Sequence, residues 1–212
     1  MELIQIILFA SLALFFAIRL YSILGRKTGH EPKPDDGPAG RDPAAPTSEE
    51  DLDRPRLRPA FTGPAAAGME AIRAADGVFE PESFLTGAVA AYKMIVISFA
   101  EGDRGVLQPL LAPDVLRRYG DAIDAREAAN RTQVARVGNI RMAEIEHASL
   151  IDGRARVEVR IDAEIATAAL DADGEVVEGD PDRFRPVTEL WTFERRIEAT
   201  DPNWVLAKVR QP

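Results

Sequence analysis

The chain has 212 residues, a formal net charge of −9 at pH 7 and no cysteine. The absence of cysteine excludes disulfide bonds, thiolate zinc sites and cysteine nucleophiles. The acidic balance argues against nucleic acid as a direct partner, because a phosphate backbone needs a positively charged protein face. The two histidines, His30 and His147, lie far apart and lack the spacing of a metal site.

The first 25 residues predict a membrane anchor. Residues 3–24 form an almost unbroken apolar run that spans ~33 Å as a helix, close to the ~30 Å hydrocarbon thickness of a bilayer. A cleaved signal peptide is the alternative, but Met1 and Glu2 supply no positive leader and no small-x-small cleavage site follows the run. The apolar side chains of the predicted span are Leu3, Ile4, Ile6, Ile7, Leu8, Phe9, Leu12, Leu14, Phe15, Phe16, Ile18 and Leu20.

The charges that flank this run predict its orientation. Arg19, Arg26 and Lys27 lie toward its C-terminal side, and no Lys or Arg precedes it. The positive-inside rule therefore places everything after residue 25 in the cytoplasm. The sequence predicts a single-pass membrane protein with a cytoplasmic C-terminal domain.

Residues 26–65 predict a disordered, proline-rich linker between anchor and domain. Eight prolines fall between residues 25 and 64, where large apolar side chains are few. A segment with so little surface to bury does not offset its ordering entropy, so we expect a coil with polyproline character. Such a coil reaches on the order of 35 Å.

Helical patterns open the predicted domain, residues 66–212. Residues 68–75 predict a short amphipathic helix, which either packs onto the domain or lies on the membrane surface. A longer helix begins at Pro81 and ends at Gly102, and its broad apolar face indicates a helix nearly surrounded by protein. Asp103 is expected to cap a short turn after this helix, and Pro113 opens a third helix.

The second half of the domain alternates between apolar and polar residues. Residues 155–167 alternate most clearly, as is typical of a strand with one buried and one solvated face. The Asp-Gly pair at 152–153 predicts a hairpin turn before this strand. Residues 186–196 and 201–206, which contain both tryptophans, predict a final pair of antiparallel strands.

About three helices followed by about four antiparallel strands predict an α+β domain. The sheet would curl around the long helix and leave a pocket at its open end, for which Ala88, Tyr92, Trp191 and Phe193 are the candidate lining residues. Core packing is the favoured interpretation of the aromatic side chains among them, because large aromatic residues dominate buried cores. The sequence contains no catalytic motif, phosphate-binding loop or metal-ligand pattern, and so predicts neither an enzyme nor a cofactor.

The order of four motifs carries a family resemblance. They are Phe-Ala-Glu-Gly-Asp at 99–103, Asp-Gly-Glu-Val-Val-Glu-Gly-Asp at 173–180, Trp-Thr-Phe-Glu-Arg at 191–195 and Asp-Pro-Asn-Trp at 201–204. Over residues 68–212 the chain resembles the Tim44-like family, most closely its bacterial, membrane-anchored members of the TimA type. The resemblance implies a cystatin-like or NTF2-like fold at the inner membrane of a bacterium.

The resemblance also implies candidate functions. The mitochondrial relative recruits a heat-shock chaperone to the protein-import channel, and another branch of the family helps to hold ribosomes at the inner membrane. This chain departs from the mitochondrial relative, because it has a transmembrane anchor and a short linker in place of a long charged region. The leading hypothesis is a non-enzymatic adaptor that binds a protein partner, such as a chaperone or translocation machinery. The alternatives are a lipid- or small-molecule-binding module that uses the pocket, and a ribosome–membrane tether.

Overall fold

The computed structural model describes residues 56–58, 63–199 and 201–212. Every described residue lies in one compact unit, within residues 46–212. The predicted anchor and most of the predicted linker therefore lie outside the described residues.

The described residues contain four helices where the sequence predicted about three. The additional helix is a single turn, α5, whose preceding Asp103 side chain accepts a hydrogen bond from the backbone N–H of Val106 at 3.1 Å. The prolines predicted to open helices occupy the first turns of α4 and α6. The four helices are α3 (Ala66–Ala75), α4 (Pro81–Glu101), α5 (Arg104–Leu107) and α6 (Pro113–Ala128).

Five strands form one sheet in the order β1-β2-β3-β4-β5. Four of them pair antiparallel, as the sequence predicted, whereas β1 pairs parallel with β2. The β1 strand comes from the segment predicted as a disordered linker, so at least these three residues belong to the sheet. The strands are β1 (Arg56–Arg58), β2 (Thr132–Ile151), β3 (Arg154–Leu170), β4 (Val176–Arg196) and β5 (Val205–Arg210).

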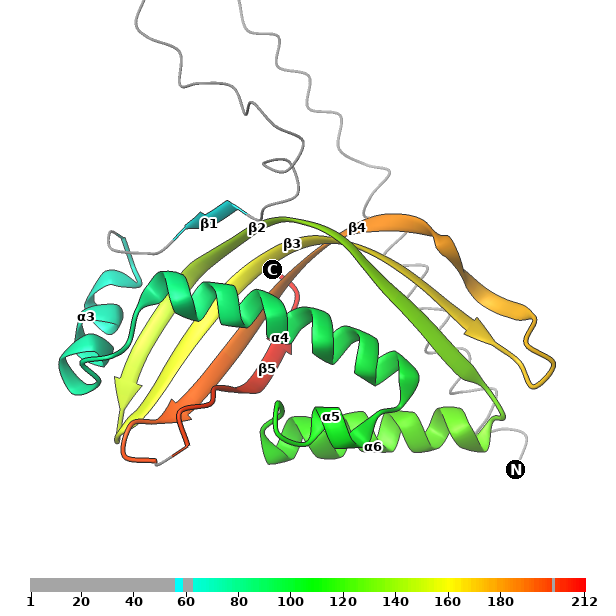
Figure 1. Ribbon diagram of the computed structural model, residues 1–212, viewed down its shortest axis with the longest axis horizontal. Helices are drawn as coiled ribbons and strands as arrows, with labels where there is room; N and C mark the ends of the chain where they lie inside the picture. Colours follow the sequence, from blue (N-terminus) through cyan, green and yellow to red (C-terminus); the bar gives the residue numbers. More distant parts are fainter. Residues whose placement is uncertain (1–55, 59–62, 200) are drawn as a thin grey trace, which may run out of the picture. The chain divides into compact units, whose positions relative to one another are not determined.

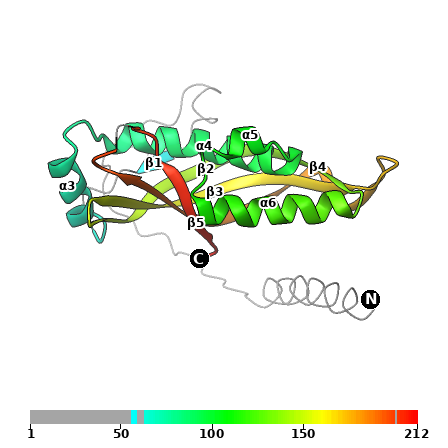
Figure 2. The ribbon, with the colours of Figure 1, turned by 90° about the horizontal axis from the view of Figure 1, so that it is seen from below.

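The long helix α4 lies against the concave face of the curved sheet (Figure 1). The α3 helix packs against β2 at one end of the domain, and α6 contacts β5 (Figure 2). Gly102 ends α4 in a left-handed conformation, with φ of 76°, so that the chain turns back into α5. The domain is thus an α+β fold, in agreement with the fold class predicted from the sequence.

The alternation of β3 separates the core from the solvent. Its inward side chains, from Ala155 to Ala163 at every second position, are all buried. The intervening charged side chains lie on the convex face. The sequence pattern therefore assigned the two faces of this strand correctly.

The segment between α5 and α6 pairs with the free edge of β5 at Leu206. The Leu206 backbone N–H donates to the carbonyl of Leu110 at 2.8 Å, and Ala112 N–H donates to the carbonyl of Leu206 at 2.9 Å. These bonds satisfy backbone groups that an edge strand otherwise leaves unpaired. The segment between α5 and α6 thereby joins these two helices to the sheet.

Gly68 allows α3 to approach β2 at backbone distance. A Cβ atom at this position would overlap the carbonyl oxygen of Ala148. We expect Gly68→Ala to lower the free energy of unfolding by about 1–3 kcal/mol, because backbone must shift to accept the methyl group. Urea unfolding followed by tryptophan fluorescence measures this change. Gly87→Ala in α4 is the matched control, since its Cβ would meet nothing within 4 Å and should stabilise the helix by up to about 1 kcal/mol. Equal stability of the two variants would contradict the prediction.

Candidate functional site

The four residues predicted to line a pocket lie together in the packed core. Ala88 and Tyr92 come from α4, and Trp191 and Phe193 come from the inward face of β4. Their exposed fractions are 4%, 0%, 2% and 2%, and all four belong to the main hydrophobic cluster. The rings of Tyr92 and Trp191 lie 4.6 Å apart between centroids. The structure thus brings these residues together, and their role in binding a ligand stays a prediction.

A partly buried carboxylate, Glu189, lies beside these aromatic residues. Its Oε2 atom accepts hydrogen bonds from the Tyr92 hydroxyl at 3.2 Å and from Trp191 Nε1 at 3.3 Å. Burial raises the pKa of Tyr92 well above its ordinary value, and the negative charge of Glu189 raises it further. The same two causes, burial first, raise the pKa of Tyr119 on α6 to about 12. Burial and, secondarily, the charge of Glu189 therefore favour the protonated form of both hydroxyls.

Glu189 is a residue that the sequence analysis missed, although the signal was present. In a strand, side chains two residues apart share one face. Glu189 has the same phase as Trp191 and Phe193, so the pattern that predicted two inward aromatic residues also placed this carboxylate inward. An acidic residue on the buried phase of a strand indicates a partner, here the hydroxyl of Tyr92 on α4.

Aromatic rings cluster at the N-terminal end of α4. The Phe84 ring lies 4.8 Å from Trp204, 5.8 Å from Phe79 and 6.0 Å from Phe193 between centroids. Phe79 and Trp204 are themselves 5.7 Å apart. Tilted and edge-to-face contacts of this kind add to the stabilisation by burial. The two tryptophan-containing motifs of the sequence thus meet the start of α4.

An ion pair between Asp76 and Arg195 lies beside this aromatic cluster. Asp76 follows α3, and its carboxylate forms a close ion pair with Arg195 of β4. The two side chains are only 12% and 10% exposed, and the Arg195 guanidinium lies 5.5 Å above the Trp204 ring. Arg195 Nε is buried without a hydrogen-bond partner among the described residues. The arginine of the Trp-Thr-Phe-Glu-Arg motif therefore joins the α3–α4 connection to the sheet.

A second arginine, Arg126 of α6, organises the other end of α4. It donates to the carbonyls of Phe99 at 2.9 Å and Ala100 at 3.0 Å, in the last turn of α4. It also donates to the Gln133 side chain at the start of β2, at 2.6 Å. Its positive charge lies at the negative end of the helix dipole. One side chain thus connects α4, α6 and β2.

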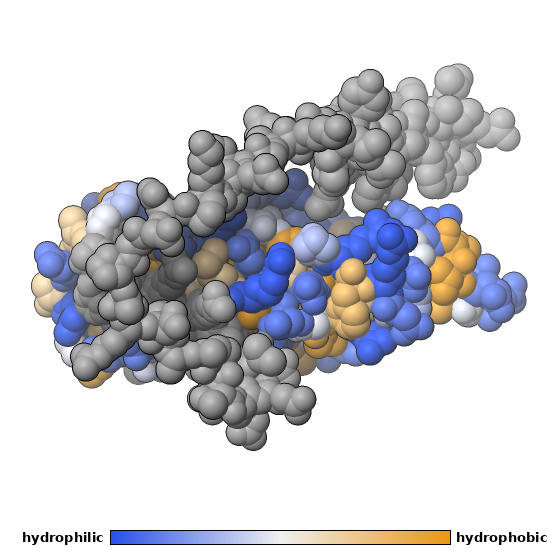
Figure 3. Space-filling view, turned by 90° about the horizontal axis from the view of Figure 1, so that it is seen from above, coloured by the Kyte–Doolittle hydropathy of each residue, from blue (hydrophilic) through white to orange (hydrophobic). Residues whose placement is uncertain are grey.

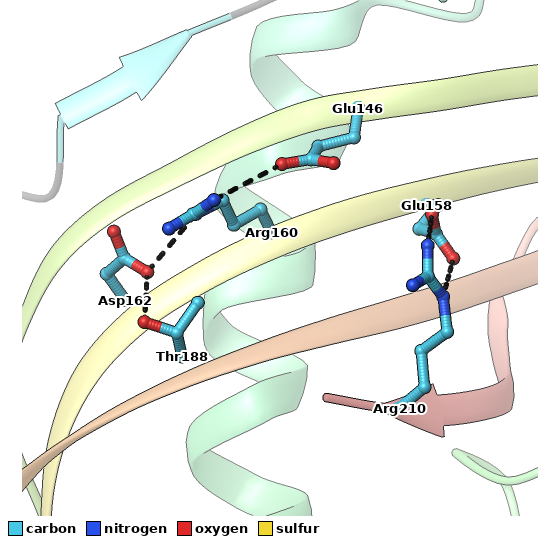
Figure 4. Close-up of polar contacts among 6 residues, drawn as sticks. All are labelled: Glu146, Glu158, Arg160, Asp162, Thr188 and Arg210. Atoms are coloured by element: carbon cyan, nitrogen blue, oxygen red, sulfur yellow. Dashed lines mark hydrogen bonds and ion pairs between the residues drawn. The ribbon is translucent and has the colours of Figure 1, made fainter. Parts of the chain in front are cut away.

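The convex face of the sheet carries two polar networks (Figure 4). In the first, Arg210 of β5 binds both carboxylate oxygens of Glu158 on β3, at 2.7 and 3.0 Å, and Thr192 donates to the same carboxylate. The hydrogen bonds from Arg210 hold the pKa of Glu158 below its ordinary value. In the second, Arg160 lies between Asp162 at 3.4 Å and Glu146 at 3.7 Å. These networks link β2, β3, β4 and β5 across the solvated face.

The convex face is largely hydrophilic where described residues are visible, with apolar patches toward the end that carries the β3–β4 connection (Figure 3). Among the described residues, no group of three or more His, Asp or Glu side chains is placed to hold a metal ion. Within the same part of the chain, α4 is long and apolar enough to cross a membrane, a test that the core helix of a domain also passes.

Residues 65–211 match the family model described as Tim44-like domain. The chain belongs to the Tim44-like family. Curated protein sequences give no match. Among solved structures, the intermembrane space region of the chloroplast protein ARC6 is similar, with 12% sequence identity and a TM-score of 0.45. The likeness covers 63% of this chain and 96% of that chain, and it carries no functional argument.

The ion pair between Asp76 and Arg195 predicts a large stability effect. We expect Asp76→Ala to lower the free energy of unfolding of the Tim44-like domain by about 3–5 kcal/mol, because Arg195 is left buried and unpaired. Urea unfolding measures the loss. Arg117→Ala is the control, since its ion pair with Asp114 has side chains 69% and 81% exposed and contributes about 0–1 kcal/mol. A loss for Asp76→Ala as small as that of the control would refute the role of the ion pair.

The raised pKa of Tyr119 predicts an alkaline loss of stability. Its folded-state value of about 12 exceeds the ordinary value of 10.0, so its contribution is complete below pH 10.0 and is lost as the pH rises toward 12. Glu189→Gln should lower the pKa of Tyr119 and leave it above 10.0, because burial is the larger cause. Tyrosinate absorbance gives the pKa, and Tyr119→Phe assigns the transition. An unchanged pKa in Glu189→Gln would show that the carboxylate does not act on Tyr119.

Proposed function

We propose that this chain is a membrane-anchored, non-enzymatic adaptor whose Tim44-like domain binds a protein partner at the cytoplasmic face of a bacterial inner membrane. Its place is among the bacterial members of the TimA type, with a cystatin-like or NTF2-like domain. Membership of the Tim44-like family supports the proposal. The apolar run at residues 3–24 and the positive charges that follow it support the anchor and its orientation.

The single structural observation that carries the proposal is the filling of the concave face. The helix α4 and the inward side chains of β4 occupy the space that the curved sheet encloses, with Tyr92 and Trp191 in contact at its centre. Side chains that fill the interior of a domain leave no room there for a ligand of similar size. Recognition then takes place on the outside of the domain, as an adaptor requires.

The second candidate is a lipid- or small-molecule-binding module, with Ala88, Tyr92, Trp191 and Phe193 around the ligand. The observation that favours it is Glu189, a carboxylate set among aromatic rings on the inward face. Small-molecule sites commonly combine apolar walls with a few polar groups of this kind. Binding there requires α4 to move away from the sheet. A ribosome–membrane tether is a variant of the adaptor in which the partner is the ribosome.

Photocrosslinking in cells tests the adaptor. A photoreactive amino acid replaces Met94 or Val106, whose side chains are exposed on α4 and α5. We expect protein adducts that disappear when residues 1–25 are deleted, because the anchor brings the domain to its partner. A photoreactive residue at Trp191 in the core provides the contrast. Adducts with lipid or small molecules alone, formed from Trp191, would overturn the adaptor in favour of the binding module, and ribosomal adducts would identify a ribosome tether.

A further inference from the structure

The two long edges of the sheet differ in their protection against strand pairing. Residues 176–189 of β4 have no strand partner on the side away from β3 among the described residues. This edge contains Pro181 and Pro186, each of which lacks a backbone N–H, and a register shift interrupts its pairing with β3. Natural sheets use these devices to keep an edge from accepting a further strand.

The edge of β2 lacks proline over residues 132–141, and its register shifts fall only after Val137, between Val137 and Ile140 and between Ile140 and Met142. Within the described part of the chain, β1 pairs with β2 at residues 142–144 and no strand pairs with the outer edge of 132–141. This stretch contains no proline, and residues 132–137 pair with β3 without interruption. Six regular residues extend ~20 Å, the length of an ordinary strand. Val134 adds an exposed apolar side chain to the convex face there.

The charge of this edge is opposite to that of the chain. Residues 129–143 contain no Asp or Glu, although the whole chain has a net charge of −9. They contain three arginines, Arg131, Arg136 and Arg141, spaced five residues apart. Arg136 pairs with Asp182 at 2.9 Å. The side chains of Arg131 and Arg141 have no partner among the residues that the structure describes.

The chain's own strand β1 pairs with the same edge of β2 further along the strand. β1 has the sequence Arg-Leu-Arg and pairs with β2 where acidic residues begin, with Arg58 opposite Glu144. Glu146 follows two residues later. β1, with its two arginines, thus pairs where the acidic residues of the edge begin, and no strand among the described residues pairs with the basic part. Opposite charges on facing strands stabilise pairing, and like charges oppose it.

The geometry points to the edge of β2 at residues 131–141 as a docking site for an extended, acidic segment of the partner protein, which adds a strand beside β2. Backbone hydrogen bonds would supply affinity, and Arg131 and Arg141 would select for carboxylates. A second copy of this chain fits less well. Symmetric antiparallel pairing about Arg136 places Arg131 opposite Arg141, so like charges face one another. The inference rests on the proposed adaptor function, to which it adds the chemistry of the partner.

A designed peptide tests the edge in the full-length protein in lipid nanodiscs. The probe is a fluorescein-labelled octapeptide of alternating Glu and Val, and the matched probe has Lys in place of Glu. We expect the Glu peptide to bind and the Lys peptide not to bind, as measured by fluorescence anisotropy. Hydrogen exchange of the amides of residues 132–141 should slow when the Glu peptide is bound.

Two charge-reversal variants distinguish binding of the Glu peptide at this edge from its general attraction to a positively charged surface. Arg131→Glu with Arg141→Glu should weaken binding by about tenfold or more, because two attractive contacts become repulsive. Arg183→Glu with Arg185→Glu makes the same change in net charge on the opposite edge, where both side chains are exposed, and should leave binding unchanged. Equal weakening by both variants, slowed exchange elsewhere in the domain, or no binding of the Glu peptide would overturn the inference. Self-association that Arg131→Glu with Arg141→Glu abolishes would identify a second copy as the occupant instead.

The same variants distinguish this inference from the proposed function. If the anchor-dependent protein adducts persist in Arg131→Glu with Arg141→Glu, the adaptor function stands and the docking site lies elsewhere. If no protein adducts form in the unmodified chain, the adaptor function fails, whatever the peptide does.

Discussion

The enclosure of α4 is the constraint on which the rest of the domain depends. Side chains along the whole helix are buried, among them Leu85, Tyr92 and Ile95. Each large apolar side chain that leaves water contributes roughly 1.5–3 kcal/mol. A flat sheet covers one side of such a helix, so long and curved strands are needed to cover more of it. β2, β3 and β4 have 20, 17 and 21 residues, and register shifts interrupt their pairing, as happens where strands bend.

The polar groups divide between this interior and the convex face. Inside, the few charged groups are partnered: Glu189 by two donors, and Arg195 by Asp76. Such contacts favour one arrangement of the segments that carry these side chains, because a buried charge without a partner costs free energy. Outside, the ion pairs are solvated and each contributes little to stability. Their distribution instead decides which charged surfaces the domain attracts.

The sequence predicted those features that local chemistry determines. Pro81 and Gly102 mark the ends of α4 because of their backbone preferences, and the alternation in β3 follows from the two faces of a strand. The contacts between distant segments were beyond it. Glu189 meets Tyr92 across 97 positions and Arg195 meets Asp76 across 119, and no local pattern encodes which inward polar group finds which partner.

The filling of the candidate site also depends on packing rather than on pattern. The sequence placed four apolar residues around the interior correctly, but the same residues serve either a cavity or a solid core. The distance between the side chains of α4 and those of β4 decides whether a cavity or a solid core forms. That distance depends on how closely α4 packs against the sheet. The β1 strand was missed for a related reason, since three residues among prolines carry too little periodicity to predict a strand.

The backbone contact between α3 and β2 has a mechanical consequence. Force on the chain before β1 reaches β2 first through the pairing of β1 with residues 142–144 and then through α3, which touches β2 at Gly68 with no side chain between them to yield. β2 pairs with β3 from Thr132 to Ile151, so the load is shared along a ladder of hydrogen bonds instead of falling on one end of it. A domain connected in this way resists tension at its N-terminal side without first losing the burial of α4.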